Sequence, residues 1–183
     1  MLDIALVHYP VCNAKNEIIG SAVTNLDIHD LARAARTYGV ASYFVVTPFA
    51  DQQKLAGEII DHWRHGYGAR HNPDRREAFS IVSVCPTLDD LYAHYAAKGQ
   101  KLPVTVATSA RGHEKSQDFS IIRQRLLAGE HFLLLFGTAS GLAPEVMAAV
   151  DVILPPVGGK EAYNHLSVRS ACSIVLDRLL GVR

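Results

Sequence analysis

Short apolar segments alternate with segments of helical periodicity along the whole chain, and this alternation constrains the fold more than any other feature. The clearest apolar segments are Phe-Leu-Leu-Leu-Phe at 132–136 and Asp-Val-Ile-Leu at 151–154, each bounded by turn residues. Apolar runs of this length are typical of strands that are buried on both faces of a parallel sheet. Strands that alternate with helices predict an α/β fold, with a mainly parallel sheet and helices on both faces.

The remaining elements are expected in the same alternating order. Further strands are expected at 3–8, 42–46, 79–84 and 104–107, and helices at 27–38, 51–65, 87–97, 119–128, 143–147 and 166–180. A long polar loop is expected over 9–26. Asp27 or Asn25 is expected to cap the first helix, and Leu55, Ile59 and Trp63 form one stripe of the second. The chain has 183 residues and no linker or repeat, so we expect one domain over 1–183.

Two glycine-bearing loops directly follow the two apolar segments, and each leads into a helix. They are Gly-Thr-Ala-Ser-Gly-Leu at 137–142 and the segment 155–165. We expect the two strands to be adjacent in the sheet. Open α/β sheets bind small ligands at the carboxyl ends of their strands, so these loops predict a ligand site. Their glycine spacing fits neither G-x-G-x-x-G nor a phosphate-binding P-loop, and an ordinary strand-to-helix turn is the alternative.

Three strings around these loops resemble the SPOUT superfamily of knotted RNA methyltransferases. They are 136–142, 151–155 and Tyr-Asn-His-Leu-Ser-Val-Arg-Ser-Ala at 163–171. The resemblance is closest to a bacterial branch of RNA methyltransferases, which also has Asn-Leu-Asp-Ile-His-Asp, found here at 25–30. It covers essentially the whole chain. It implies a single SPOUT domain with a deep C-terminal trefoil knot over about 104–183, S-adenosylmethionine (SAM) bound in the knot, and a homodimer.

The resemblance also implies which residues bind the cofactor. Backbone groups of the loops would hold the adenine, with Leu154 and Leu166 as apolar walls. Ala139 stands where the branch usually has glycine. The loop is also one residue shorter than G-x-E-x-x-G-L of the ribose 2′-O-methyltransferases, so the acceptor chemistry transfers less well than the cofactor site. The implied cofactor residues are Thr108, Ser109, Gly137, Thr138, Gly141, Leu142, Leu154, Val157, Gly158, Asn164, His165, Leu166 and Ser167.

The expected first helix carries the candidate catalytic residues. The segment 27–40 is similar to the ribose methyltransferase motif N-x-G-x-x-x-R-x-x-x-x-F-G-V, with Arg33 on its arginine and Asp27 on its asparagine. Arginine stays protonated, so Arg33 would position a phosphate or an acceptor oxygen. If the acceptor is a guanine ring nitrogen, Asp27 or Asp30 could take the proton. If it is a ribose hydroxyl, Arg33 and a phosphate are the better candidates. Alternatively, Arg33 is a solvated residue of an amphipathic helix.

Basic and aromatic residues gather at 62–76, a mixture that suits RNA through phosphate contacts and base stacking. Arg111, with His113 and Lys115, forms a second small basic loop. The alternative for the segment 62–76 is a polar loop in which Trp63 is buried. His62, His65 and His71 have no cysteine nearby and no H-E-x-x-H motif, so no metal site is expected. The candidate RNA-binding residues are Arg64, Arg70, Arg75, Arg76 and Arg111.

The composition limits where RNA can bind and which cellular compartment the protein occupies. Lysine and arginine total 18 and aspartate and glutamate total 18, so any RNA-binding face must be a local patch. Cys12, Cys85 and Cys172 lie far apart and predict reduced, buried thiols. No signal peptide or membrane span is expected, which predicts a cytoplasmic protein.

We therefore expect a SAM-dependent RNA methyltransferase that acts on a base nitrogen or a ribose 2′-hydroxyl of tRNA or rRNA. One alternative is a knotted RNA-binding relative without catalysis. The other is a methyltransferase that acts on a small molecule, which the neutral net charge keeps open.

Overall fold

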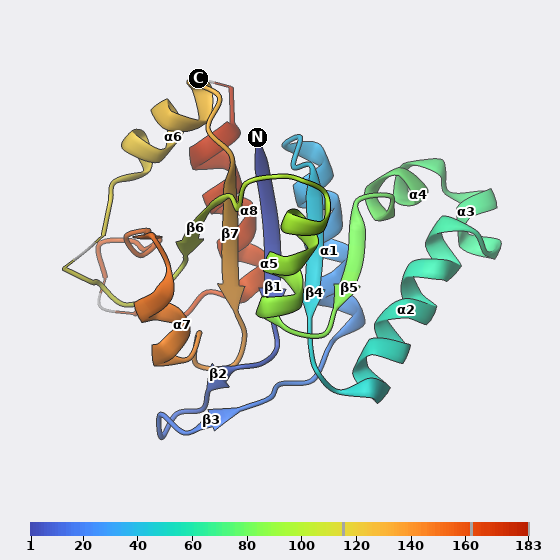
Figure 1. Ribbon diagram of the computed structural model, residues 1–183, viewed down its shortest axis with the longest axis horizontal. Helices are drawn as coiled ribbons and strands as arrows, with labels where there is room; N and C mark the ends of the chain where they lie inside the picture. Colours follow the sequence, from blue (N-terminus) through green and yellow to red (C-terminus); the bar gives the residue numbers. More distant parts are fainter. Residues whose placement is uncertain (115, 162, 183) are drawn as a thin grey trace.

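The computed structural model describes residues 1–114, 116–161 and 163–182, and its centre is a six-stranded sheet (Figure 1). The strand order is β5-β4-β1-β7-β6-β8, and every pairing is parallel. The strands are β1 (Leu2–Val7), β4 (Ser42–Val46), β5 (Val82–Cys85), β6 (Val104–Ala107), β7 (Phe132–Gly137) and β8 (Val152–Ile153). The parallel sheet that the sequence predicts is confirmed.

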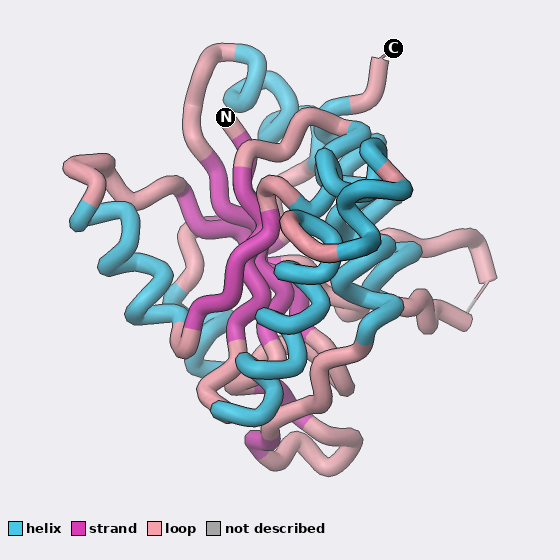
Figure 2. The backbone as a smooth tube through the Cα atoms, turned by 90° about the vertical axis from the view of Figure 1, so that its right-hand side faces the viewer, coloured by secondary structure: helices cyan, strands magenta, loops and turns pink. Residues whose placement is uncertain are grey.

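Helices cover both faces of this sheet, as expected, and Figure 2 shows the strands between two helical layers. Side chains of β1 alternate between the two cores: Ile4 and Leu6 belong to one, Ala5 and Val7 to the other. The first face packs against α1 (Asn25–Thr37), α2 (Ala50–Arg64), α4 (Pro73–Phe79), α6 (Phe119–Leu127) and α8 (Val168–Leu180). The second face packs against α5 (Leu88–Ala97) and α7 (Pro144–Ala149).

The prediction that the strands before the two glycine loops are adjacent is wrong. β6 lies between them and pairs with β7 on one side and β8 on the other. Hydrophobic patterns identify strands but carry no information on strand order, which long-range pairing decides. The two loops still emerge at the same end of the sheet, because all three strands are parallel.

Two regions contain more regular structure than expected. The loop after β1 forms a small hairpin of β2 (Val11–Cys12) and β3 (Ile18–Ile19), which are antiparallel. The polar segment after α2 forms α3 (Tyr67–His71) and α4, so β5 begins at Val82 and not at residue 79. Phe79 ends α4 and is fully buried, which explains why it extended the apolar alternation of the strand that follows.

Local contacts also correct the predicted helix details. Thr24, and neither Asn25 nor Asp27, caps α1: its hydroxyl accepts from the Asp27 amide (3.1 Å) and donates to Asp27 Oδ2 (2.6 Å). This reciprocal arrangement is related to a capping box, except that the Asp27 carboxylate accepts from the Thr24 hydroxyl, and it fixes Asp27 through both its backbone and its side chain. In α2, the buried stripe runs through Ala56 and Ile60, while Leu55 is 40% exposed.

The three cysteines are buried and free, as predicted. Among the described residues, no helix has the length and apolar character that a membrane crossing requires. In the same part of the chain, His, Cys, Asp and Glu side chains form no group of three that could ligate a metal ion.

Candidate functional site

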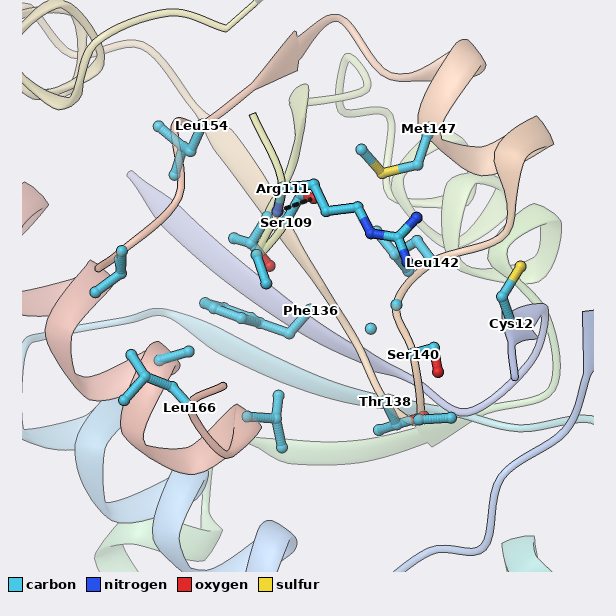
Figure 3. A pocket seen from close by; sticks show the side chains of 18 of the residues that line it. Cys12, Ser109, Arg111, Phe136, Thr138, Ser140, Leu142, Met147, Leu154 and Leu166 are labelled. Carbon is cyan, nitrogen blue, oxygen red and sulfur yellow. Dashed lines mark hydrogen bonds between the residues drawn. The ribbon is translucent and has the colours of Figure 1, made fainter. Parts of the chain in front are cut away.

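A cavity of about 780 Å³ opens at the carboxyl ends of β6, β7 and β8 (Figure 3). Three segments far apart in the sequence line it: 108–113 after β6, 136–142 at the end of β7, and parts of 154–168 after β8. We call this cavity the strand-end pocket. The ligand site that the sequence predicts at this end of the sheet is therefore a real cavity in the fold.

The loop after β7 folds back over the end of its own strand, and Gly137 makes this possible. A Cβ atom at Gly137 would lie 2.6 Å from the Leu142 nitrogen and 2.9 Å from the Gly141 carbonyl carbon, closer than any side chain tolerates. Gly141 has a φ of 114°, which favours glycine. Strand β2 holds the loop in place through two backbone hydrogen bonds of Cys12. Cys12 N donates to Gly141 O (2.9 Å), and Ser140 N donates to Cys12 O (2.9 Å).

The walls of the strand-end pocket are mainly apolar. Phe136, Leu154 and Leu166 lie on one side of it in Figure 3, and Leu142 and Met147 lie across from them. Phe136 and Leu154 are almost completely buried, whereas Leu166 is 43% exposed. Apolar walls beside a loop with free backbone edges suit a flat, partly polar ring such as a purine.

Nearly all of the predicted cofactor-binding residues surround this pocket, although their role stays a prediction. The exception is Gly158, which is exposed and does not line it. Asn164 ties the two outer segments together, since its Nδ2 donates to Ala110 O (3.2 Å). The residues that do line the pocket are Thr108, Ser109, Gly137, Thr138, Gly141, Leu142, Leu154, Val157, Asn164, His165, Leu166 and Ser167.

Among the described residues, one carboxylate lines the strand-end pocket, and it belongs to Asp27 of α1. Besides its bond from Thr24, Asp27 forms an ion pair through Oδ1 with Arg169 Nε (3.3 Å). Arg169 Nη1 also lies 3.5 Å from Asp30 Oδ2, one turn further along α1. Sequence reasoning missed Arg169. Arg169 lies inside the string 163–170 that carries the resemblance, but a local motif does not show that the Arg169 side chain contacts α1.

A partly buried hydrogen-bond chain connects His8 to Thr138, which lines the strand-end pocket. His8 is fully buried just after β1, and its Nδ1 lies 3.0 Å from Ser21 Oγ. Ser21 Oγ lies 2.5 Å from Thr138 Oγ1, which also donates to Val7 O (3.0 Å). Burial lowers the pKa of His8 to about 4, although the Asp27 carboxylate acts in the opposite direction. His8 is therefore neutral near pH 7, and the sequence offered no sign of its role.

Arg33 does not line the strand-end pocket. It lies at a second cavity of about 500 Å³ between α1 and α4, which we call the α1–α4 cleft. Arg75 and Asn72 line the same cleft, as does an ion pair between Arg36 Nη2 and Glu77 Oε1 (2.6 Å). Within one chain, the predicted catalytic residues Arg33 and Asp27 thus open onto different cavities.

The predicted RNA-binding arginines have different environments. Arg64 is engaged inside the fold: its guanidinium donates to the carbonyls of Phe79 (2.8 Å), Ser80 (2.9 Å) and Val82. Burial lowers the pKa of Arg64. These contacts give Arg64 a structural role in joining α4 to β5 and do not favour an RNA contact.

The other arginines are accessible. The Arg75 guanidinium lies 4.5 Å from the centroid of the half-buried Trp63 ring, while Arg70 in α3 and Arg76 in α4 are exposed. Arg111 is exposed and borders the strand-end pocket. Lys115, which the sequence groups with Arg111, lies outside the described residues.

A parallel α/β sheet with a pocket built from glycine loops at its strand ends is typical of α/β proteins that bind small ligands. Comparison with protein families narrows this class, because residues 1–181 match the family described as SAM-dependent RNA methyltransferase. The chain belongs to this family. Its cofactor is therefore SAM, and the resemblance found in the sequence is confirmed.

The curated relatives include tRNA (guanine-N(1)-)-methyltransferases. The chain is 43% identical over 177 residues to the one from Oleidesulfovibrio alaskensis and 41% identical to the one from Nitratidesulfovibrio vulgaris. Each match covers 97% of this chain but only 41% of the relative, so the chain spans less than half of their length. An uncharacterized protein from Aquifex aeolicus is 36% identical, with 97% of this chain and 87% of that protein covered.

Solved structures show the same fold in SpoU methyltransferases. AviRb from Streptomyces viridochromogenes superposes with a TM-score of 0.59 at 17% identity, over 98% of this chain and 58% of AviRb. The TrmH/SpoU tRNA modifying enzyme of A. aeolicus superposes with a TM-score of 0.56 at 14% identity, over 98% of this chain and 73% of that enzyme. AviRb is also known in complex with AdoMet.

Proposed function

We propose that this chain methylates tRNA, that the strand-end pocket holds SAM, and that Asp27 accepts the proton of the methylated group. One observation carries the proposal. Three distant segments, two of which the sequence marks as cofactor loops, meet around a single cavity that also contains a carboxylate. Two relatives more than 40% identical to this chain are named tRNA methyltransferases, which supports tRNA as the substrate.

The residues around the strand-end pocket fit the cofactor. Phe136, Leu154 and Leu166 would contact the two faces of the adenine, and the backbone of 137–142 would hydrogen-bond its edge. The close approach at Gly137 keeps this backbone in place. Bound there, SAM supplies a sulfonium methyl group that an acceptor lone pair can take.

Asp27 favours a base nitrogen as the acceptor over a ribose hydroxyl. A ring N–H must lose its proton as the nitrogen is methylated, and Asp27 is the carboxylate that borders the pocket. Arg33, the residue that a ribose acceptor would call for, lies at the α1–α4 cleft. More than half of each named relative lies outside the match, so the N1 atom of guanine is not carried over to this chain.

The α1–α4 cleft and the arginines beside it would contact the RNA backbone. Arg33 and Arg75 line the cleft, and Arg70 and Arg76 are exposed nearby. Because Glu77 neutralises Arg36, Arg33 and Arg75 are the cleft cations best placed for phosphate. This local arrangement suits RNA although the net charge of the whole chain is zero.

The trefoil knot and the homodimer belong to the same proposal. β8 lies at the sheet edge, the segment after it reaches Ala110 through Asn164, and α8 returns to pack on α1 in the first core. This path supports a C-terminal helix that threads through a loop. Leu26 and Tyr163 are 60% and 79% exposed, and such apolar side chains near the pocket support an interface with a second copy.

The proposal is tested in two steps with the purified protein. Isothermal titration with SAM should show binding, and a protein that binds none cannot be the enzyme. Tritiated methyl transfer into tRNA, rRNA and small-molecule fractions from cells lacking the protein should label tRNA, and nucleoside mass spectrometry should then find a base methylated on nitrogen. Binding without transfer would instead favour a non-catalytic RNA-binding relative, and label in the small-molecule fraction would favour the other alternative.

A further inference from the structure

Arg169 links the wall of the strand-end pocket to the helix that carries its carboxylate. It stands in the first turn of α8, directly after Ser167 and Val168, which line the pocket. Its side chain faces α1, with Nε 3.3 Å from Asp27 Oδ1 and Nη1 3.5 Å from Asp30 Oδ2. One guanidinium therefore bridges two carboxylates on consecutive turns of another helix.

The two carboxylates differ in their surroundings. The side chain of Asp27 is 16% exposed, receives a second contact from Thr24 Oγ1 (2.6 Å) and borders the pocket. The side chain of Asp30 is 47% exposed and does not border it. Both distances to Arg169 are longer than the 2.7–2.9 Å that is typical of a tight charged hydrogen bond. Arg169 is thus shared between the two partners and tightly bound to neither.

We propose that Arg169 is a positioning residue that holds Asp27 toward the acceptor and shifts onto Asp30 when Asp27 takes the proton. The inference rests on the proposed function. In the step concerned, the acceptor nitrogen bonds to the methyl carbon while the carbon–sulfur bond breaks and leaves its electron pair on sulfur. The N–H proton passes to a carboxylate oxygen of Asp27, which leaves the Asp27 side chain neutral.

Asp30 lowers the free energy that Arg169 needs to leave Asp27, because it offers a second carboxylate. Once Asp27 is neutral, its attraction for the guanidinium is lost, and a cation left without a partner in a partly buried place is costly. Asp30 Oδ2 is already 3.5 Å away and can take over the pairing. The planar fork of arginine presents separate N–H groups to the two carboxylates in a fixed geometry, whereas the single ammonium of lysine is a point charge that reproduces this arrangement only in part.

Steady-state kinetics on tRNA test this role. Arg169→Ala should lower kcat about 10- to 100-fold, the size of effect that misplacing a catalytic group produces. The KM for SAM should stay within about twofold, because the lost contact is to Asp27 and not to the cofactor. Arg169→Lys should recover part of kcat, and Asp30→Asn should lower kcat less than Arg169→Ala. A raised KM with an unchanged kcat, or no recovery with lysine, would overturn the inference.

Arg125→Ala is the matched control. Arg125 has nearly the same side-chain exposure as Arg169, 31% against 33%, and pairs with Glu130 at 2.7 Å on the opposite end of the sheet. Its loss should leave kcat and KM unchanged. A fall in kcat equal to that of Arg169→Ala would show that any lost ion pair has this effect and would refute the positioning role.

A double-mutant cycle separates this inference from the proposed function, because it needs no RNA. Arg169→Ala and Asp27→Asn, alone and combined, are compared by urea unfolding, and the combined loss should be smaller than the sum of the single losses. Additive losses would overturn the inference even if the wild-type protein methylates tRNA. Coupled losses in a wild-type protein that methylates no RNA would refute the proposed function, and the proton step with it.

Discussion

A cluster of ionisable side chains lies at each end of β1, and the clusters differ in their contact distances and in whether they border a cavity. At the amino end, Asp3 is 2% exposed, accepts from the Tyr95 hydroxyl (2.8 Å) and lies 2.7 Å from His131 Nε2. At the carboxyl end, Arg169 is shared between Asp27 and Asp30 at longer distances, beside an open pocket.

The same residue types therefore serve two purposes. The amino-end cluster has short contacts and lines neither cavity, and burial together with Asp3 raises the pKa of Tyr95, which keeps its phenol protonated. Such a cluster holds β1, α5 and the segment before β7 together. In the carboxyl-end cluster, Arg169 contacts two carboxylates, and one of them, Asp27, borders a cavity that a ligand can fill. Longer contacts beside a cavity are what the proposed function requires at this end of the sheet.

The largest effect is expected from Asp27→Asn. Removal of a general base typically costs 10²–10⁴-fold in rate, so kcat should fall by about 100-fold or more. Asparagine can still accept the hydrogen bond from Thr24 but loses the charge that pairs with Arg169, so the stability should fall only by the contribution of that ion pair. Rapid-quench methyl transfer and urea unfolding measure the two effects. An unchanged kcat would remove Asp27 from the chemistry.

A pH dependence of stability should come from His8. Its pKa is about 4 in the folded protein and 6.5 in the unfolded chain, so between these values the unfolded state binds more protons. Stability should therefore fall as the pH drops from 6.5 to 4, by about 3 kcal/mol for His8, on the order of 1.4 kcal/mol per pH unit. The pKa of His29 is also lowered, mainly by burial, so His29 should likewise reduce the stability as the pH falls.

The variant His8→Asn tests that assignment, because its amide can replace Nδ1 in the contact with Ser21. Urea unfolding between pH 4 and 7 should show a flatter profile than that of the wild-type protein. If both proteins lose stability equally on acidification, His8 is not responsible.

At the amino end, Tyr95→Phe should reduce stability and leave catalysis intact. It leaves buried Asp3 with one fewer donor, which costs about 1–3 kcal/mol in the free energy of unfolding. Thermal and urea unfolding measure the loss, and kcat at a temperature where the variant is folded should match the wild-type value. A large fall in kcat with normal stability would mean that both clusters serve the reaction.

The smallest effects overall are expected in the α1–α4 region, where Arg75→Ala and Arg64→Ala should behave differently. Arg75 borders the cleft, so its loss should weaken tRNA binding and reduce the dependence of log affinity on log salt by about one. Arg64 binds three backbone carbonyls, so its loss should lower stability and spare the salt dependence. Filter binding over a range of salt concentrations distinguishes them, and identical salt slopes for the two variants would contradict the distinction.

Local sequence patterns predict the strands, most helices and the pocket-forming loops, because each depends on nearby residues. Phe-Leu-Leu-Leu-Phe at 132–136 can be little else than a buried strand, and Gly137 is required where the loop meets Leu142. Contacts between distant segments are different. The place of β6 between β7 and β8, and the pairing of Arg169 with Asp27, depend on tertiary packing that no local pattern contains.

Burial also reverses some local interpretations. Arg64 lies in the densest basic segment and so suggested RNA binding, yet its donors are used by the chain itself. His8, in contrast, stands in an unremarkable strand end and gave no signal, although it is buried beneath the pocket loop. Whether a charged or polar group is free to act depends on which distant groups surround it.

The central claim is that the strand-end pocket binds the methyl donor with its reacting end toward Asp27. A crystal structure with S-adenosylhomocysteine tests this most directly. The account predicts adenine density between Leu154, Leu166 and the loop 137–142, with the sulfur directed toward Asp27. Density in the α1–α4 cleft, or a sulfur that faces away from α1, would contradict it.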